Sequence, residues 1–563
     1  MNDYNIFVEK KILLLKSDRV ICFALLEQNK IVEAVQYFEL YINKLKKLLK
    51  YKKYKKYIEE ELTFSENIFY EKIFELAEEF YNNSDMANAA ICYTFYFKHS
   101  QETENTCLIK KYIETLKSLK QIDIAVDLLN NIANISSKNK LLSELYADNA
   151  DYNKAIKCME QYIKEKSNCV SADDYNLLGC YYNSLFSDVS DNMADAEKSL
   201  KYFELASDMV VTNKLFSKNA TVMAGKTGNM VACRKYWDRC LKIGNLTNDD
   251  KFDYASFCMK MADFETFYEY FEARFQKENN KTEFPFIKKP CWDGNSDISD
   301  KTLLIYFEQG YGDTFLMFGY MPQLLNLAKK VIFVVQNAVY PLLKNNEFGI
   351  EILPEMEEEY INDINFDYYI PSMSLFKALK INRNNISVGE GYIKADKLLS
   401  KNFKQRFFNN KKLKIGLSVS GNTLGDKTRD IPIDYLLPLD KLKNVELYML
   451  TKGIDDDLLL KFKNNRVNNI GNNFADFNET AAAIENCDLV LTTDNCILNL
   501  AGAMGKRTYA LFNNPSHFRW FDLSGKNMVW FTSVKPFVNK SYNAWNTSVS
   551  AIIKEIQKLS FSK

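Results

Sequence analysis

The stretch "FEQGYGD" (307–313) places one carboxylate directly after an apolar run and two glycines. Gly310 and Gly312 predict a tight turn whose backbone N–H groups stay open, a geometry that favours an anion at the start of a helix. Asp313 at such a turn could act as a general base. It could equally cap the following helix, because aspartate is a good N-cap. This stretch alone leaves both interpretations open.

A second group of polar residues follows the predicted strand 415–419. The loop after it begins with Ser420, Gly421 and Asn422, and it continues with the cations Lys427 and Arg429. Small residues at a strand end with a cation nearby suit a diphosphate. The alternative is a solvated basic loop without a ligand.

Two further strand ends carry polar residues. Thr451 and Lys452 end "LYMLTKG", and Asp494 and Asn495 lie between "LVLTT" and the small-residue stretch "CILNLAGA". Backbone amides at the start of such a helix can hold a phosphate, while the side chains hold sugar hydroxyls. Three strand ends in one part of the chain therefore predict a common ligand site.

The elements that must position these residues alternate between short β-rich runs and helical stretches from about residue 301. The β-rich runs form two groups, 301–395 and 412–535. This alternation predicts two parallel sheets with helices on both faces. Two such sheets form a ligand cleft between their carboxyl edges. The stretch after "EQGYGD" lacks the third glycine of a dinucleotide fingerprint, so no NAD is expected.

The first half of the chain reads as helix after helix. Seven segments are assigned one pattern, a small residue followed by apolar or aromatic positions at helical spacing, with successive distances mostly near 34 residues. A helical hairpin that recurs at this period is typical of tetratricopeptide-like repeats, whose concave face suits a peptide or protein. The anchoring positions of the seven segments are Ala34, Ala90, Ala125, Ala155, Ser199, Ala232 and Phe267.

The overall composition excludes several classes of protein. Lys+Arg and Asp+Glu both number 73, so no broad attraction to nucleic acid is expected. There are only two histidines, which argues against His-rich metal sites, and the acids 455–457 read as a charged helix start. Without a predicted signal peptide or membrane-spanning run, we expect a cytoplasmic protein that is not inserted in a membrane.

These motifs resemble a known family. "WDG" (292–294), "EQGYGDTFLMFGYMP", "GLSVSGN", "TKG", the stretch from "NNFADFNET" to "NLAGAMGK", and Trp520 look like the bacterial tetratricopeptide-repeat glycosyltransferases. Their catalytic half is similar to the ADP-heptose heptosyltransferases. The resemblance covers about residues 285–560 with the motifs in order, and the repeat half agrees in type.

The resemblance implies a tetratricopeptide-like α-solenoid followed by a GT-B pair of Rossmann-like domains. The expected domains are 1–280 for the repeats, 281–400 for the acceptor side with the catalytic base, and 401–563 for the nucleotide-sugar. It implies an inverting transfer without a metal or other cofactor.

The resemblance also assigns roles to residues. Asp313 would be the base. The donor-binding residues would be Gly310, Gly312, Ser420, Gly421, Asn422, Lys427, Thr451, Lys452, Asp494, Asn495 and Asn499. At the last two positions, family members usually carry Thr and His. Asn495 and Asn499 keep hydrogen bonding but remove a titratable group, which leaves the donor, and activity itself, open.

The leading hypothesis is therefore a glycosyltransferase that moves a sugar from a nucleotide-sugar to a Ser or Thr hydroxyl of a protein. Flagellin or another surface protein is the acceptor that the resemblance suggests. Transfer to a lipid-linked or polysaccharide acceptor is an alternative, supported only by the lysine run 44–61. A non-catalytic repeat adaptor with a degenerate GT-B half is the alternative from another class.

Overall fold

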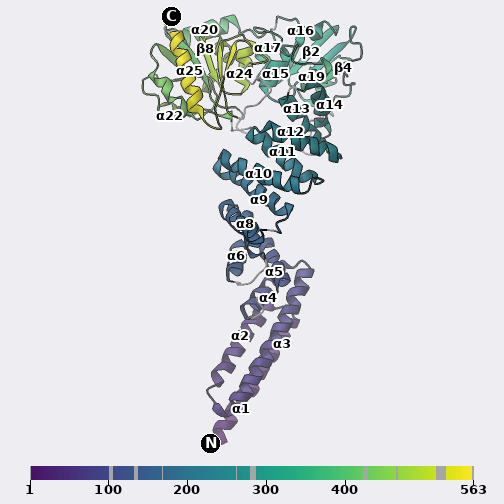
Figure 1. Ribbon diagram of the computed structural model, residues 1–563, viewed down its shortest axis with the longest axis vertical. Helices are drawn as coiled ribbons and strands as arrows, with labels where there is room; N and C mark the ends of the chain where they lie inside the picture. Colours follow the sequence, from purple (N-terminus) through teal and green to yellow (C-terminus); the bar gives the residue numbers. More distant parts are fainter. Residues whose placement is uncertain are drawn as a thin grey trace. The chain divides into compact units, whose positions relative to one another are not determined.

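The structure is a computed structural model of the chain (Figure 1). It describes residues 2–99, 105–131, 137–167, 169–261, 263–278, 284, 287–345, 347–421, 429–464, 467–514 and 528–560. The predicted donor-binding residues Asn422 and Lys427 lie outside the described residues, and so does Trp520.

The chain divides into two compact units, Met1–Val210 and Val211–Lys563. The first unit consists of helices, and the second begins with two more helical hairpins before its sheets. The last helical turn before the sheets is Glu272–Gln276 (η3). The helical region thus ends close to the predicted domain boundary at residue 280. The division between the two compact units lies 70 residues earlier, at residue 210.

The helices pair as consecutive hairpins, as the repeat pattern predicts. In the first unit they are α1 (Asn2–Glu27), α2 (Ile31–Leu48), η1 (Lys52–Tyr54), α3 (Lys55–Asn82), α4 (Met86–His99), α5 (Thr106–Ser118), α6 (Ile122–Asn131), α7 (Lys138–Asp148), α8 (Tyr152–Lys166), α9 (Ala172–Leu185), η2 (Phe186–Ser190) and α10 (Met193–Met209). In the second unit they are α11 (Lys214–Thr227), α12 (Met230–Ile243), α13 (Asn248–Lys260) and α14 (Phe264–Phe271). Each even-numbered helix packs on the helix before it.

The seven anchoring positions of the repeat pattern lie on the even-numbered helices α2 to α14, and all seven are buried. The α9–α10 hairpin shows why small residues are needed there. A Cβ on Gly179 would lie 2.7 Å from the ring of Phe203, and the Ser199 hydroxyl donates to the Gly179 carbonyl at 2.7 Å. Small side chains allow the paired helices to approach this closely.

Buried aspartates fasten successive hairpins to each other. Asp174 at the start of α9 closes a capping box with Ser171 and accepts from Lys140 of the preceding hairpin at 2.7 Å. Asp250 at the start of α13 repeats this arrangement with Thr247, and accepts from Lys214 and Lys218 of α11. The same device therefore recurs once in each unit.

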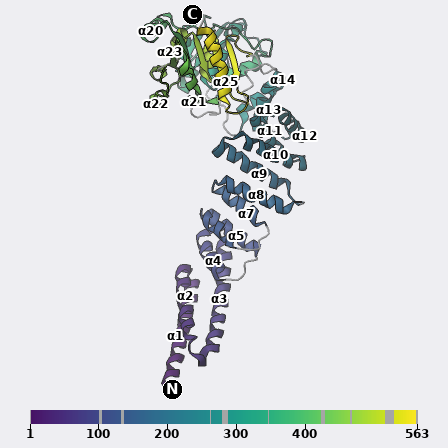
Figure 2. The ribbon, with the colours of Figure 1, turned by 60° about the vertical axis from the view of Figure 1, so that its left-hand side comes forward.

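Two parallel sheets follow (Figures 1 and 2). The first has the order β3-β2-β1-β4, with β1 (Thr302–Tyr306), β2 (Lys330–Val335), β3 (Glu351–Pro354) and β4 (Tyr368–Pro371). The second has the order β10-β9-β8-β5-β6-β7, with β5 (Leu413–Ser418), β6 (Val445–Met449), β7 (Val467–Asn469), β8 (Leu489–Thr492), β9 (Thr508–Phe512) and β10 (Val534–Val538). All described pairings between these strands are parallel.

Helices connect and cover the strands. They are α15 (Tyr311–Phe318), α16 (Met321–Leu325), α17 (Tyr340–Leu343), α18 (Glu358–Ile361), η4 (Ser372–Ser374), α19 (Leu375–Ala378), α20 (Lys397–Phe407), α21 (Ile433–Leu436), η6 (Leu437–Lys441), α22 (Asp456–Leu459), η7 (Gly471–Asn473), α23 (Phe477–Asn486), α24 (Cys496–Ala503) and α25 (Trp545–Ser560). The last helix packs on β9 and β10. The predicted fold class, helical repeats followed by two Rossmann-like domains, is confirmed.

The acids 455–457 begin α22, where the Asp455 side chain accepts from the Asp457 amide at 3.0 Å. They therefore form a capped helix start, as the sequence suggests. Among the described residues, no helix combines the length and the apolar character that crossing a membrane requires.

We predict that Asp250→Asn lowers the free energy of unfolding at pH 7 by about 2 kcal/mol. Two lysines and the capping bonds outweigh burial and hold the pKa of the folded Asp250 at about 2, below its ordinary 3.8. A depressed pKa stabilises the fold above pH 3.8, and this contribution is lost as the pH falls towards 2.

The measurement is urea unfolding of wild type and variant from pH 7 to pH 3. The difference between them shrinks below pH 4. The exposed Glu265→Gln, in the next helix, serves as the control and shows little difference at any pH. A difference for Asp250→Asn that stays constant down to pH 3 would contradict the prediction.

Candidate active site

Each sheet has one point at which its strand order reverses. In the first sheet the chain passes from β1 to β2 on one side, while β4 pairs with β1 on the other. In the second sheet β6 and β8 flank β5 in the same way. Ligands of open parallel sheets bind outside the carboxyl ends of the strands at such switch points. The ends of β1, β5 and β8 are therefore the places to examine.

The turn after β1 places Asp313 in the first turn of α15. Asp313 is 8% exposed, and its Oδ2 accepts from the Gly310 amide at 3.2 Å, which closes the start of the helix. Gln309 adopts a left-handed conformation with φ 65°, and Gln336 donates to its carbonyl at 3.4 Å. The N-cap of α15 is thus Gly310, whereas the alternative interpretation of this stretch placed it at Asp313; from the third helical position the Asp313 carboxylate closes the capping box.

Asp313 also faces the second sheet's helix α24. Burial, with a smaller contribution from the negative charge of Asp313, raises the pKa of the Cys496 thiol, at the start of α24, to about 11. The thiol is therefore neutral at physiological pH. The carboxylate of one Rossmann-like domain and the helix N-terminus of the other consequently share one environment.

Asn495 is the N-cap of α24, and its side chain ties the ends of β5 and β8 together. Its Oδ1 accepts from the amides of Ile497 and Leu498 and from the Thr492 hydroxyl. Its Nδ2 donates to Ser418 Oγ at 2.9 Å and to the Ser420 carbonyl at 3.0 Å. Both amide hydrogens are therefore used within the protein, which leaves the side chain little capacity for a ligand.

Asp494 and Arg429 lie beside this cap. Arg429 Nη1 donates to the Asp494 carbonyl at 3.2 Å and approaches Asp494 Oδ1 to 3.9 Å. The Thr493 hydroxyl donates to the Arg429 carbonyl. The sequence already placed Arg429, two residues after Lys427, among the cations near this strand end, although the motif resemblance did not assign it to the donor.

The remaining predicted residues at the second sheet differ in exposure. Ser420 is half-buried, whereas Gly421 is exposed and donates through its amide to Asp430 Oδ1 at 3.1 Å. Thr451 is buried, and its hydroxyl accepts from the Val419 amide at 3.0 Å. Lys452 is exposed, and its Nζ donates to the Phe474 carbonyl at 2.9 Å. Thr451 thus holds the end of β5, while Ser420 and Gly421 lie nearer to solvent.

Helices α15 and α24 pack directly on each other (Figure 1). A Cβ on Gly312 would lie 2.2 Å from Asn499 Nδ2 and 3.4 Å from the Cys496 Cα. The absence of a side chain at Gly312 therefore allows the second Rossmann-like domain to approach this closely. Asn499 is 2% exposed, and its Oδ1 has no hydrogen-bond partner among the described residues. A buried carbonyl of this kind normally requires a water or a ligand group.

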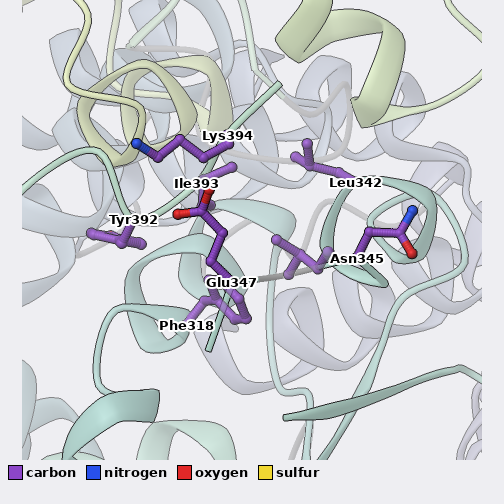
Figure 3. A pocket seen from close by; sticks show the side chains of 8 residues that line it. Phe318, Leu342, Asn345, Glu347, Tyr392, Ile393 and Lys394 are labelled. Atoms are coloured by element: carbon purple, nitrogen blue, oxygen red, sulfur yellow. The ribbon is translucent and has the colours of Figure 1, made fainter. Parts of the chain in front are cut away.

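A small hollow lies elsewhere, lined by the end of α15, by α17 with the turn after it, and by residues 392–394 (Figure 3). Its volume of about 30 Å³ has room for about two water molecules. The Tyr392 hydroxyl beside it donates to the Phe315 carbonyl at 3.2 Å, and burial raises the pKa of Tyr392. This hollow is too small for a nucleotide-sugar, so it is not the candidate site.

Within the described ranges, no group of three or more His, Cys, Asp and Glu residues could hold a metal ion. Transfer without a metal stays a prediction. The roles of Asp313 and of the donor-binding residues likewise stay predictions.

Sequence reasoning missed one buried charged group beside the site. Arg274 of η3 is 2% exposed and pairs with Glu308, the second residue of "FEQGYGD". The available signal was an arginine next to phenylalanines in the stretch "FEARF", because a charge that is buried with apolar residues needs partners.

No family model matches the chain. Protein FlbA of Caulobacter vibrioides is 30% identical over 88 residues, which are 16% of this chain and 14% of FlbA. The chain thus aligns with only a small part of the length of that curated relative.

Three solved structures illustrate the similarity in fold. A glycosyl transferase family 9 protein from Veillonella parvula has 11% identity and a TM-score of 0.38, over 48% of this chain and 100% of that one. ADP-heptose LPS heptosyltransferase II of E. coli has 9% identity and a TM-score of 0.34, over 46% and 99%. MamA of Desulfovibrio magneticus RS-1 has 12% identity and a TM-score of 0.26, over 31% and 94%. Likeness at this level describes the fold and assigns no activity.

We predict that Gly312→Ala costs about 1–3 kcal/mol of folding free energy, because the new methyl group collides with Asn499. The matched control is Gly310→Ala, whose Cβ would meet only Asp313 Oδ2, at 3.6 Å. Urea unfolding of Gly312→Ala, Asn499→Ala and the double variant measures the coupling between the two positions. Strictly additive losses would show that α15 and α24 do not meet here.

Proposed function

We propose that the second unit is a glycosyltransferase that uses a nucleotide-sugar donor, with Asp313 as the catalytic base. The observation that carries this proposal is the meeting of α15 and α24. A buried carboxylate from one parallel sheet thereby faces the helix N-terminus of another, and both lie at switch points. A base opposite an anion-binding helix start is the arrangement that sugar transfer from a diphosphate requires.

The donor diphosphate would bind at the start of α24. Exposed Gly421 and half-buried Ser420 stand at the adjacent end of β5, and Arg429 adds a positive charge beside Asp494. The free carbonyl of Asn499 offers an acceptor for a sugar hydroxyl. In this proposal Asn495 and Thr451 shape the site and do not bind the donor. Lys452 would have to release the Phe474 carbonyl to reach the nucleotide.

The reaction would proceed in one displacement. Asp313 takes the proton of the acceptor hydroxyl, and the oxygen attacks the anomeric carbon from the side opposite the diphosphate. The bond between this carbon and the diphosphate oxygen breaks, and the diphosphate leaves with the electron pair. The configuration inverts, and the positive end of the α24 dipole with nearby cations stabilises the departing charge in place of a metal.

For the acceptor we propose a protein hydroxyl on Ser or Thr, held by the helical hairpins. The first hairpins expose large apolar side chains, including Leu13, Leu14 and Val20 on α1 and Phe64 on α3. Exposed apolar groups on repeat helices suit a polypeptide partner. A flagellin-like or other surface protein, modified in the cytoplasm before export, is the acceptor that the motif resemblance suggests.

A second candidate is a repeat adaptor that does not turn over donor. It is favoured by Asn495, whose amide hydrogens are all used inside the protein, and by Asn499, which packs on Gly312. A thermal-shift panel of nucleoside diphosphates and nucleotide-sugars separates the two candidates, because a ligand of the native state raises the melting temperature. A shift with one sugar nucleotide and its diphosphate supports the transferase, and no shift with any favours the adaptor.

We predict that Asp313→Asn lowers turnover of the donor identified in this way at least 100-fold, with the thermal shift by the donor unchanged. Asparagine preserves the capping bond to Gly310 but cannot take a proton. The matched control is Asp396→Asn, an exposed N-cap of α20 that accepts from the Leu399 amide, which should keep full turnover.

Acceptor transfer is read as a mass increase on the protein substrate. Wild-type turnover by Asp313→Asn would exclude this residue as the base. Loss of the donor-induced thermal shift in this variant would instead assign Asp313 to donor binding.

A further inference from the structure

The last helical hairpin contacts the first Rossmann-like domain at several points, among them Phe267 on Phe376 and one buried arginine. Arg274, in η3, is 2% exposed, and its guanidinium lies over the rings of Phe271 and Phe275 at 4.2 and 4.1 Å. Its Nε and Nη2 donate to the two oxygens of Glu308 at 2.6 and 3.0 Å. Such a two-point pair fixes both the position and the orientation of the carboxylate.

The remaining hydrogens of the guanidinium are used as well. Nη1 donates to Glu272 at 2.7 Å and to the Phe271 carbonyl at 3.2 Å, and Nη2 donates to Ser374 Oγ at 2.7 Å. All three nitrogens therefore have partners, as a buried arginine requires. A lysine could not reproduce this set, because it lacks the planar fork.

The partners of Arg274 stand at the switch point of the first sheet. Glu308 follows β1, and Ser374 belongs to η4, directly after β4. These are the two neighbouring strands between which the strand order reverses. Arg274 thus joins their carboxyl ends from outside the sheet, and the connection comes from the helical hairpins.

The turn that carries Asp313 is held at both ends. Arg274 fixes Glu308, and the next residue, Gln309, has a left-handed backbone whose carbonyl accepts from Gln336. Gln336 Oε1 in turn accepts from Thr314, the residue after Asp313. If Glu308 moved, the strained Gln309 would be released, and the cap at Gly310 with it.

We propose that Arg274 is a positioning residue, through which the α13–α14 hairpin sets the turn 308–313 and so the place of Asp313. The α13–α14 hairpin then sets the geometry of the active site and does not only bind substrate. Its effect on turnover rests on the proposed function, whereas its effect on the turn does not.

Hydrogen exchange followed by mass spectrometry tests the effect on the turn in the full chain. We expect amides of 307–314 to exchange at least tenfold faster in Arg274→Lys and in Glu308→Gln, with the segment 489–503 unchanged. The matched control is Glu351→Gln, which breaks an exposed ion pair with Lys330 on the same sheet. It should alter neither segment.

Unchanged exchange at 307–314 in both variants would overturn the proposal. Equal acceleration of 307–314 and 489–503 would overturn it too, because a general loss of stability would then explain the result. Hydrogen exchange is measured without a donor, so its outcome does not depend on whether the transferase proposal is correct.

Turnover gives the second readout. Arg274→Lys should lower kcat at least tenfold and leave the KM for the donor within twofold, because a displaced base weakens the transition state and not donor binding. A kcat equal to wild type, measured on folded variant, would show that Arg274 has a purely structural role.

Discussion

The second unit depends on the close contact between α15 and α24. Each helix starts at the carboxyl end of a parallel sheet, so their contact brings the two switch points together. The contact is possible because position 312 has no side chain, and Asn499 occupies the space that a Cβ would fill. The close approach of the first turn of α15, which carries Asp313, to Cys496 at the start of α24 follows from this one constraint.

Most of the fold could be predicted from the periodicity of the sequence, because the burial of apolar side chains imposes that periodicity on each helix and strand. Small residues recur in the hairpins because the paired helices pack closely. At Gly179, for example, a Cβ would collide with the ring of Phe203. The strands β3, β7 and β10 gave no comparable signal. Glu351–Pro354 and Val467–Asn469 are short edge strands, and Val534–Val538 is an edge strand that contains a proline and is only partly buried. Their pairing is decided by neighbours distant in the sequence.

The candidate site shows the same division between local and distant information. A glycine-rich turn after an apolar strand marked Asp313, and a helix start marked Asn495. The sequence could not show that Asn495 donates both amide hydrogens to Ser418 and Ser420, because these partners lie more than 70 residues away along the chain. Arg274 was missed for the same reason, since Glu308 is 34 residues further along the chain.

Capping and catalysis are compatible roles for one carboxylate. The structure uses aspartates at the third position of helices repeatedly, at Asp174, Asp250 and Asp313. The first two are neutralised by lysines of the preceding hairpin, which makes them part of the scaffold. Asp313 instead lies at a switch point, opposite a second helix start. The surroundings of the carboxylate, and not its position in the helix, therefore separate a candidate base from a cap.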